Sequence, residues 1–389
     1  MRLLVIPFVI GLMLPYTIKY WMVSHKMTLL CYFLVTSLMS FGLIPLFYKL
    51  GLILDITDKP GGRHIHQQIT PRTGGITIYI AFISALYMVA QPPPEFLGLS
   101  FASSIIALTG MLDDIRRLPA TVKLLAQIMA TAVLIKFGIV LSFFPKHLMG
   151  QILSIFLTYL WVLGITNAYN CLDGLDGLAG GIGMVILGFY SAIAYSLKDQ
   201  FMTLVGIILF GAIAGFLPYN FRIKKRALVF LGDTGSTFIG FMLAALSIFG
   251  TWGTHKSVDL AIPILLLAVP ITDMVMTTFT RIYDHKVKTL RQWMEYSGND
   301  HFHHRLLALG LSSRTAVLTI WTFTLLMGLV ALLIKTGTIF ESLIALGIAL
   351  IIFGLVMLGM VYEDLTQIRA ENKKMFLKSS KNITFCSYV

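Results

Sequence analysis

The chain has 389 residues, of which 57% are apolar and only 12% are charged, and its mean hydropathy is +0.83. Soluble globular domains carry about 25% charged residues, so this composition excludes an ordinary water-soluble enzyme, a disordered chain and a disulfide scaffold. The apolar residues suffice for about ten or eleven membrane-spanning helices of about 20 residues each. The three cysteines (Cys31, Cys171 and Cys386) are odd in number and far apart, which indicates neither a disulfide framework nor a zinc site.

Twelve apolar windows predict an all-α fold, a polytopic integral membrane protein. The windows lie near residues 3–23, 28–50, 74–92, 97–112, 119–143, 149–167, 177–196, 201–219, 233–252, 258–280, 314–335 and 339–362. Pro15 and Lys19 interrupt the first window, so we expect about eleven spans, or twelve if residues 3–23 also cross. A start at Met22 or Met27 would remove that window.

This pattern divides the chain into an extra amino-terminal hydrophobic segment (1–27), a membrane-embedded domain (28–362) and a basic tail (363–389). The net charge of +12 by itself leaves nucleic acid, anionic lipid and phosphorylated substrates open as partners. Most Lys and Arg residues lie between alternate windows, in segments such as 52–73 and 281–313. Short loops rich in Lys and Arg stay in the cytoplasm, so this face and the tail are predicted to be cytoplasmic.

Ionisable residues at membrane boundaries are costly and tend to be functional, and three short aspartate motifs end or begin windows on the predicted cytoplasmic face. The first is GMLDDIRRLP, residues 110–119, with Lys123 on the following helix. Adjacent carboxylates such as Asp113 and Asp114 repel each other unless a cation compensates. The pair therefore suggests a divalent-metal site or a general base, the alternative being a solvated loop before Pro119.

The second motif is NAYNCLDGLDGLAGG, residues 167–181. Asn167, Asn170, Asp173 and Asp176 follow one another at intervals of three, so a continuing helix would place their oxygen atoms along one face. The glycines permit close approach of the backbone to a ligand. The alternative is a polar turn between two spans.

The third motif is FLGDTGS, residues 230–236, which opens a new window. A helix amino terminus offers free N–H groups and the positive end of the helix dipole, which suits a phosphate. Asp233 could hold a magnesium ion against that phosphate. The alternative is that Asp233 only caps the helix.

Two further segments carry cations on the same face. The histidines of Asp300-His301-Phe302-His303-His304-Arg305 could ligate zinc, but the adjacent arginine favours hydrogen bonding to an anion. The first loop contains DKPGGRHIH, residues 58–66, and PRTGG, residues 71–75. It offers flexible backbone and positive charge, or serves only as a positive-inside anchor.

Together these motifs resemble those of the polyprenyl-phosphate N-acetylhexosamine-1-phosphate transferases. The resemblance extends from about residue 28 to residue 362 and is strongest to the WecA and TagO type, which starts O-antigen, enterobacterial common antigen or teichoic acid synthesis. The related phospho-MurNAc-pentapeptide translocase usually has three consecutive histidines, whereas this chain has His301-Phe302-His303-His304. Pentapeptide transfer in peptidoglycan synthesis is therefore the alternative within the superfamily.

The resemblance implies transfer of N-acetylhexosamine-1-phosphate, most simply GlcNAc-1-phosphate, from its UDP conjugate to undecaprenyl phosphate, with release of UMP. It places the protein in the bacterial inner membrane, with catalytic loops and the carboxyl terminus in the cytoplasm. The implied cofactor is Mg²⁺, or else Mn²⁺, and no nucleic acid is expected as a partner. The resemblance leaves a homodimer open.

The resemblance also assigns roles to residues of this chain. Asp233 and Asn170 would hold the metal. The catalytic residues would be Asp113, Asp114, Asp173, Asp176, His303 and His304, and the substrate-binding residues Lys59, Lys123, Asn167, Asn170, Phe230 and Arg305. Asp113 either removes a proton from the acceptor or orients it. The second pKa of a phosphate monoester is about 6, which favours orientation because much of the acceptor is already dianionic. Direct attack and a covalent phospho-aspartyl intermediate both remain open.

A transporter or lipid flippase is the alternative from a different class. Transporters place ionisable residues near the bilayer midplane, often in broken helices. In this chain the acidic residues gather at one face instead, with Asp273 as the main exception. An aromatic prenyltransferase and a CDP-alcohol phosphotransferase fit less well, because Ile115-Arg116-Arg117 follows the aspartate pair and Gly180 stands where the latter family has an arginine.

Overall fold

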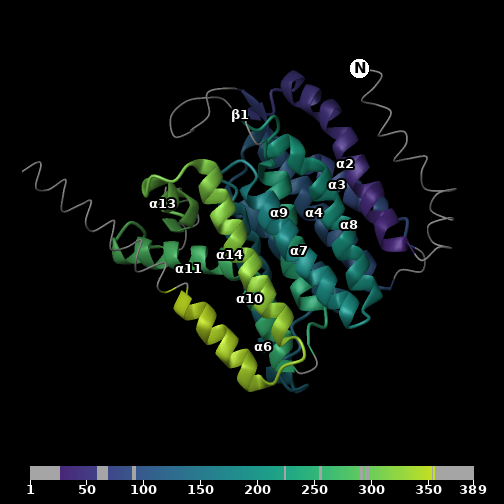
Figure 1. The fold of residues 1–389 in the computed structure, drawn as a ribbon, viewed down its shortest axis with the longest axis vertical. Helices are drawn as coiled ribbons and strands as arrows, with labels where there is room; N and C mark the ends of the chain where they lie inside the picture. Colours follow the sequence, from purple (N-terminus) through teal and green to yellow (C-terminus); the bar gives the residue numbers. More distant parts are fainter. Residues whose placement is uncertain are drawn as a thin grey trace, which may run out of the picture.

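The computed structural model describes residues 27–58, 69–89, 93–222, 225–253, 256–289, 292–293, 296, 298, 300–352 and 354. These residues form a bundle of helices with one short pair of strands (Figure 1). The segment 1–26, Lys59 and the tail from residue 363 lie outside the described residues, so the predictions made for them stay predictions.

Helices account for nearly all of the described chain. They are α2 (Thr28–Ile53), α3 (Gly74–Leu86), α4 (Glu95–Arg116), α5 (Ala120–Lys136), α6 (Leu148–Cys171), α7 (Leu178–Ser196), α8 (Gln200–Asn220), α9 (Gly232–Phe249), α10 (Lys256–Leu266), α11 (Ala268–Tyr283), α13 (Phe302–Ala308) and α14 (Ser313–Ile334), followed by Ile339–Ile352. The strands β1 (Thr57–Asp58) and β2 (Thr70–Pro71) pair antiparallel. The predicted helical fold class is confirmed apart from this pair.

Each predicted window from 28–50 to 314–335 contains a helix, and the window 339–362 is helical from Ile339 to Ile352, where its described residues lie, but the predicted number of eleven spans is not confirmed. Among the described residues, seven helices are long and apolar enough to cross a membrane, or eight if α10 and α11 form one span bent by 72°. Helix α3 has 13 residues and α5 has 17. Hydropathy windows merged these shorter helices with apolar loop residues, which made them look long enough to span.

Helix α9 lies at the centre of the bundle (Figure 1) and packs against α3, α4 and α6. Its neighbours approach closely because glycines face them: a side chain on Gly75 would collide with the backbone of Gly235, and one on Gly110 with the backbone of Thr234. Lipid tails are as apolar as helix side chains, so helices in a membrane associate through close packing rather than through the hydrophobic effect. Small residues permit this packing because they let the backbones approach closely. The glycine contacts therefore fix the start of α9 against α3 and α4.

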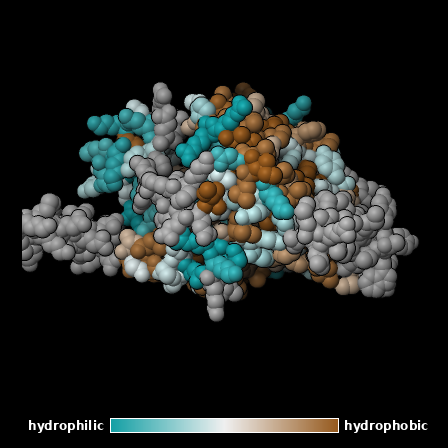
Figure 2. Space-filling view, turned by 90° about the horizontal axis from the view of Figure 1, so that it is seen from above, coloured by the Kyte–Doolittle hydropathy of each residue, from teal (hydrophilic) through white to brown (hydrophobic). Residues whose placement is uncertain are grey.

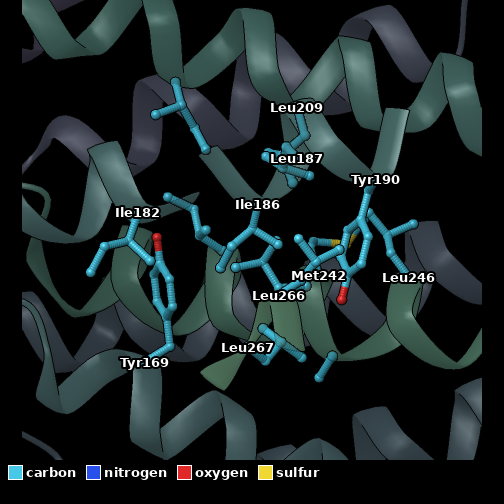
Figure 3. Close-up of a cluster of buried hydrophobic side chains, with 14 of the residues drawn as sticks. Tyr169, Ile182, Ile186, Leu187, Tyr190, Leu209, Met242, Leu246, Leu266 and Leu267 are labelled. Atoms are coloured by element: carbon cyan, nitrogen blue, oxygen red, sulfur yellow. The ribbon is translucent and has the colours of Figure 1, made fainter. Parts of the chain in front are cut away.

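Large side chains fill the space between α6, α7, α8 and α9 (Figure 3). Tyr190 of α7 is buried and stacks on Trp252, with ring centroids 4.4 Å apart. Tyr169 of α6 points toward Ile182 in Figure 3, and its hydroxyl donates to the backbone oxygen of Ala179. This bond joins the end of α6 to the start of α7, on either side of the turn within the second aspartate motif.

Many large apolar side chains remain exposed on the outer helices, including Phe156 on α6 (61%) and Leu333 on α14 (80%). Contiguous exposed apolar surface of this kind marks contact with a membrane or a partner. Figure 2 looks onto the end of the bundle that carries β1 and α13. Hydrophilic residues gather on the side where α13 lies, beside a broad hydrophobic surface. The exterior is that of a multi-pass membrane protein.

Candidate active site

The three aspartate motifs meet at one end of the bundle. The first lies at the end of α4, the second in the turn between α6 and α7, and the third at the start of α9. Asp173 interacts electrostatically with Asp233, Asp114 and Asp176, and Asp233 interacts with Asp113. The prediction that these five carboxylates share one site is consistent with this arrangement.

Asp113 is 3% exposed and both of its oxygens have partners. Oδ2 accepts a hydrogen bond from Lys123 Nζ at 2.8 Å, and Oδ1 accepts one from the backbone N–H of Leu118 at 2.5 Å. The Lys123 ammonium supplies the compensating cation that an aspartate pair requires. The side chain of Lys123 remains 31% exposed, so its charge can also reach a ligand.

Asp114 closes the amino terminus of α9. Its Oδ1 accepts the backbone N–H of Asp233 at 2.8 Å, and its Oδ2 accepts the backbone N–H of Thr234 at 2.9 Å and the Thr234 hydroxyl at 2.6 Å. Carboxylates are stabilised at the positive end of a helix. The N–H groups that the sequence predicted for a phosphate are therefore already used by a carboxylate from α4.

The second motif leaves the helix sooner than predicted. Helix α6 ends at Cys171 and a turn spans residues 172–177, so Asp173 and Asp176 do not continue the helical face of Asn167 and Asn170. Leu172-Asp173-Gly174 begins the turn, where glycine favours departure from the helix. The expectation of one continuous helical stripe was wrong.

The turn is held by Asn220 at the end of α8 and by Ala227 in the loop that follows. Asp176 Oδ2 accepts the N–H of Ala227 at 2.9 Å. The buried Asn220 accepts the N–H of Gly177 at 2.8 Å and donates to the backbone oxygen of Val229 at 3.0 Å. Gly177 has a φ of +81°, a conformation that glycine adopts without steric cost.

Asp173 lies in this turn, within a strongly negative environment. Burial, together with the negative charges of Asp233 and Asp114, raises the pKa of Asp173 to about 8, although Arg72 acts in the opposite direction. The surrounding negative charge therefore favours the protonated form of Asp173.

The two asparagines have different surroundings. Asn167 and Gln127 exchange two side-chain hydrogen bonds, of 2.8 and 3.2 Å, between α6 and α5. Asn170 Oδ1 accepts the hydroxyl of Ser236 at 2.5 Å, one turn along α9 from Asp233. This structure thus gives Asn167 a helix-bridging position, while Asn170 lies beside the third motif.

The segment from Pro71 to Gly75 lies alongside the start of the third motif. Phe230 donates its N–H to Pro71 O at 2.8 Å and accepts the N–H of Gly74 at 3.0 Å, while Gly75 donates to Leu231 O at 2.8 Å. These bonds bring Arg72 to the site, where it interacts with Asp173 and Asp233. Arg72 also bonds Asp58 across the strand pair at 3.0 Å.

The histidine segment forms the start of α13 and reaches the second motif. The ring of His303 lies so close to Gly174 that a side chain there would collide with it. Both ring nitrogens of His303 are buried without a hydrogen-bond partner among the described residues. Burial and the neighbouring His304 and His301 lower the pKa of His303 to about 3, so this ring is neutral. The pKa of His304 is also lowered, mainly by burial.

Comparison with known proteins identifies the family. Residues 96–251 match the model of the family described as glycosyl transferase family 4. The chain is 30% identical, over 90% of its length and 96% of the relative, to the probable undecaprenyl-phosphate N-acetylglucosaminyl 1-phosphate transferase of Bacillus subtilis (strain 168). Identity is also 30% to the undecaprenyl-phosphate alpha-N-acetylglucosaminyl 1-phosphate transferase of Escherichia coli (strain K12), over 80% of this chain and 83% of that protein. It is 31% to the decaprenyl-phosphate N-acetylglucosaminephosphotransferase of Mycolicibacterium smegmatis, over 75% and 79%.

The chain belongs to glycosyl transferase family 4. The matched range contains all three aspartate motifs and ends before the histidine segment, whereas the B. subtilis relative aligns over nearly the whole chain. The resemblance inferred from the motifs is thereby confirmed.

A divalent cation is implied by the family, and the donor set of the site fits one. The described residues contain no group of three or more His, Cys, Asp or Glu arranged to hold a metal ion, which counts against zinc at the histidines. Mg²⁺ differs, because it is commonly held by one or two carboxylates together with water and substrate phosphates. Asp233 and Asn170 both carry hard oxygen atoms of this kind, and Asn170 Oδ1 bonds the hydroxyl of Ser236, one turn along α9 from Asp233.

Two residues of the site were not assigned a role by sequence reasoning. Asn220 bonds to Gly177 of the second motif, but an isolated amide at the end of an apolar helix carries no recognisable pattern. Arg72 was noted only as one of several loop cations. Its position in PRTGG, two residues before the glycine pair that starts α3, was the available signal.

Proposed function

We propose that this chain transfers GlcNAc-1-phosphate from UDP-GlcNAc to undecaprenyl phosphate and releases UMP. The B. subtilis and E. coli relatives are named as undecaprenyl-phosphate N-acetylglucosaminyl 1-phosphate transferases, which supports the reaction and the acceptor. The observation that carries the proposal is the gathering of five aspartates from three motifs around Lys123 and Arg72. A site that alternates carboxylates with cations suits a diphosphate and its metal ion.

In this reaction an oxygen of the lipid phosphate attacks the sugar-bearing phosphorus of the donor. The bond from that phosphorus to the oxygen of UMP breaks, and a new phosphate–phosphate linkage joins the sugar phosphate to the lipid. Several negative charges must approach one another, so catalysis depends on positioning and on positive charge. Lys123 and Arg72 are the protein cations that supply it.

The surroundings of Asp113 favour positioning over proton removal. Lys123 and the Leu118 N–H already engage its two oxygens, and an acceptor phosphate with a second pKa of about 6 is largely dianionic at neutral pH. Asp113 therefore orients Lys123 toward the lipid phosphate. Asp114 holds the start of α9 in place for the same purpose.

The remaining residues act on the donor. Asp233 and Asn170 would hold Mg²⁺, which when bound neutralises phosphate charge. Phe230 would stack on uracil, with Asp173 and Asp176 on the nucleoside side. Neutral His303, together with His304 and Arg305, would hydrogen-bond to phosphate or sugar, because a neutral ring with unused nitrogens can both donate and accept.

The motif end of the bundle is proposed to face the cytoplasm across the bacterial inner membrane. In the sequence, the cationic segments 220–232 and 281–313 fall on the same side of the windows as the aspartate motifs, which follows the positive-inside pattern. The reaction supports the same orientation, because UDP-sugars are soluble cytoplasmic nucleotides and the acceptor is an anionic lipid. The two substrates can meet only at the membrane surface.

Purified protein given UDP-GlcNAc, undecaprenyl phosphate and Mg²⁺ should release one UMP for each lipid product. Release of UDP would instead mean glycosyl transfer and would contradict the proposal.

Asp233→Asn should abolish turnover at ordinary Mg²⁺ concentration. The matched control is Asp199→Asn, because Asp199 only caps α8 through the Met202 N–H and asparagine caps equally well. A panel of UDP-N-acetylhexosamines scored by UMP release would establish the sugar.

A further inference from the structure

Helix α11 holds the histidine segment through Asp273, the acidic residue that sequence analysis set apart from the motifs. Asp273 is 1% exposed. Its Oδ1 accepts the backbone N–H of Phe302 at 2.6 Å, and its Oδ2 lies 2.7 Å from Nδ1 of His301. The carboxylate thus caps the first turn of α13, in which His303 and His304 lie.

Arg281 provides a second attachment two helical turns further along α11. Its guanidinium donates to both carboxylate oxygens of Asp300, at 2.7 and 2.8 Å. Such bidentate pairs fix orientation as well as distance. Arg281 also lies 4.7 Å from the centre of the Tyr296 ring, and its side chain is 4% exposed.

The two attachments are connected through His301. Arg281 Nη2 lies 3.1 Å from His301 Nε2, and Nδ1 of the same ring lies 2.7 Å from Asp273 Oδ2. His301 therefore connects Asp273 and Arg281 of α11.

The buried face of α11 carries both attachments. Asp273, Thr277 and Arg281 recur at intervals of four and are buried, whereas Phe279 and Tyr283 on the same helix are exposed. Helix α11 leaves α10 at 72° and runs sideways below α13 in Figure 1. Its attachment therefore determines where the segment from Asp300 to Arg305 lies.

The segment from Asp300 to Arg305 contacts the second aspartate motif where there is little room for movement. The ring of His303 packs on Gly174, between Asp173 and Asp176. A small shift of the first turn of α13 would separate His303 from this turn, and a displacement of about 1 Å can cost about 100-fold in rate.

We propose that Asp273 and Arg281 are positioning residues, which hold His303 and His304 against the second aspartate motif for catalysis. This inference rests on the proposed function. It accounts for an ionisable residue within a membrane span without invoking transport. It also explains why a short α13 of seven residues can hold two histidines in fixed places.

The test compares Asp273→Asn and Arg281→Lys with wild type in the full-length protein. Asparagine keeps an oxygen for the Phe302 N–H but loses the charge, and lysine keeps the charge but loses the bidentate geometry. Each variant should lower kcat at least tenfold, change KM for UDP-GlcNAc less than threefold and keep a cooperative melting transition. The matched control is Asp284→Asn at the end of α11, where Asp284 pairs with Lys286 on the exposed surface. This control should behave as wild type.

A kcat within threefold of wild type in both variants would overturn the inference. A loss of kcat that only follows a loss of folded protein, measured by melting and by monodispersity, would also overturn it. If Asp273→Asn does not fold, Arg281→Lys decides the question alone. An inactive wild type would instead contradict the proposed function, so the two failures are distinguishable.

Discussion

Asp114 and Thr234, which are 120 residues apart in the chain, are joined by two hydrogen bonds to the same carboxylate oxygen. Thr234 is 1% exposed, so neither its hydroxyl nor that oxygen can exchange this bond for one to water. The first and third motifs are consequently assembled by direct contact and do not depend on a shared ligand to meet.

Thr234→Val removes the hydroxyl and keeps the shape of the side chain. A buried carboxylate that loses one partner should lower the free energy of unfolding by about 1 to 3 kcal/mol. Thr234→Ser keeps the hydroxyl and is the matched control, with a smaller effect. Unfolding of both variants in detergent micelles measures the difference. Equal stability of the two variants would show that this hydrogen bond contributes little.

Gly174→Ala should displace His303, because the added carbon would collide with its imidazole ring. We expect UMP release to fall by about 100-fold, the cost of a misplacement of about 1 Å. The control is Gly164→Ala on α6, where an added carbon meets no atom within 4 Å. Unchanged activity in Gly174→Ala would remove His303 from the site, whereas a loss in both variants would point to a general effect on helix α6.

Asp173 makes stability depend on pH in a specific direction. Its pKa is raised to about 8 in the folded protein from an ordinary value of 3.8. Its contribution to stability is therefore fully present below about pH 4 and is lost as the pH rises through about 8. With chelator present and no substrate, the melting temperature of wild type should fall between pH 6 and pH 9.

Asp173→Asn carries no titrating group at this position and should lose less stability over the same pH range. The comparison isolates Asp173, because the other carboxylates titrate in both proteins. Parallel melting curves from pH 6 to pH 9 would show that Asp173 is already ionised in the folded protein.

Gly298→Cys tests the proposed orientation. Cys171 is exposed, so the experiment requires a background in which the native cysteines are replaced by serine. A membrane-impermeant thiol reagent should label residue 298 in inverted membrane vesicles and leave it unlabelled in intact cells. Labelling only from the outside would reverse the orientation.

The helices of the bundle and the meeting of the three motifs were predictable from the sequence, because both depend on local patterns. Apolar runs define the helices, and alternation of the loops placed all five aspartates at one end. The number of spans was not predictable in this way. Hydropathy does not distinguish the 13 residues of α3 from the apolar residues that follow them.

The partners of individual side chains were beyond the sequence. Asn167 faces Gln127 from 40 residues away, and Asp114 reaches α9 across an even longer separation. Helical spacing indicated that Asn167 and Asn170 share a face, but it contained nothing about what lies opposite. Asp273 illustrates the same limit, because only the folded chain places His301 and Phe302 beside it.

The turn at 172–177 is fastened before any substrate arrives, by Tyr169 to Ala179, by Asn220 to Gly177 and by Asp176 to Ala227. Immobilising a flexible loop during binding weakens affinity, because its lost conformational freedom opposes association. Here the turn has already lost that conformational freedom during folding. The donor therefore meets a rigid recognition element, and mutations that loosen these fastenings should weaken donor binding through entropy, even where they remove no contact to the nucleotide.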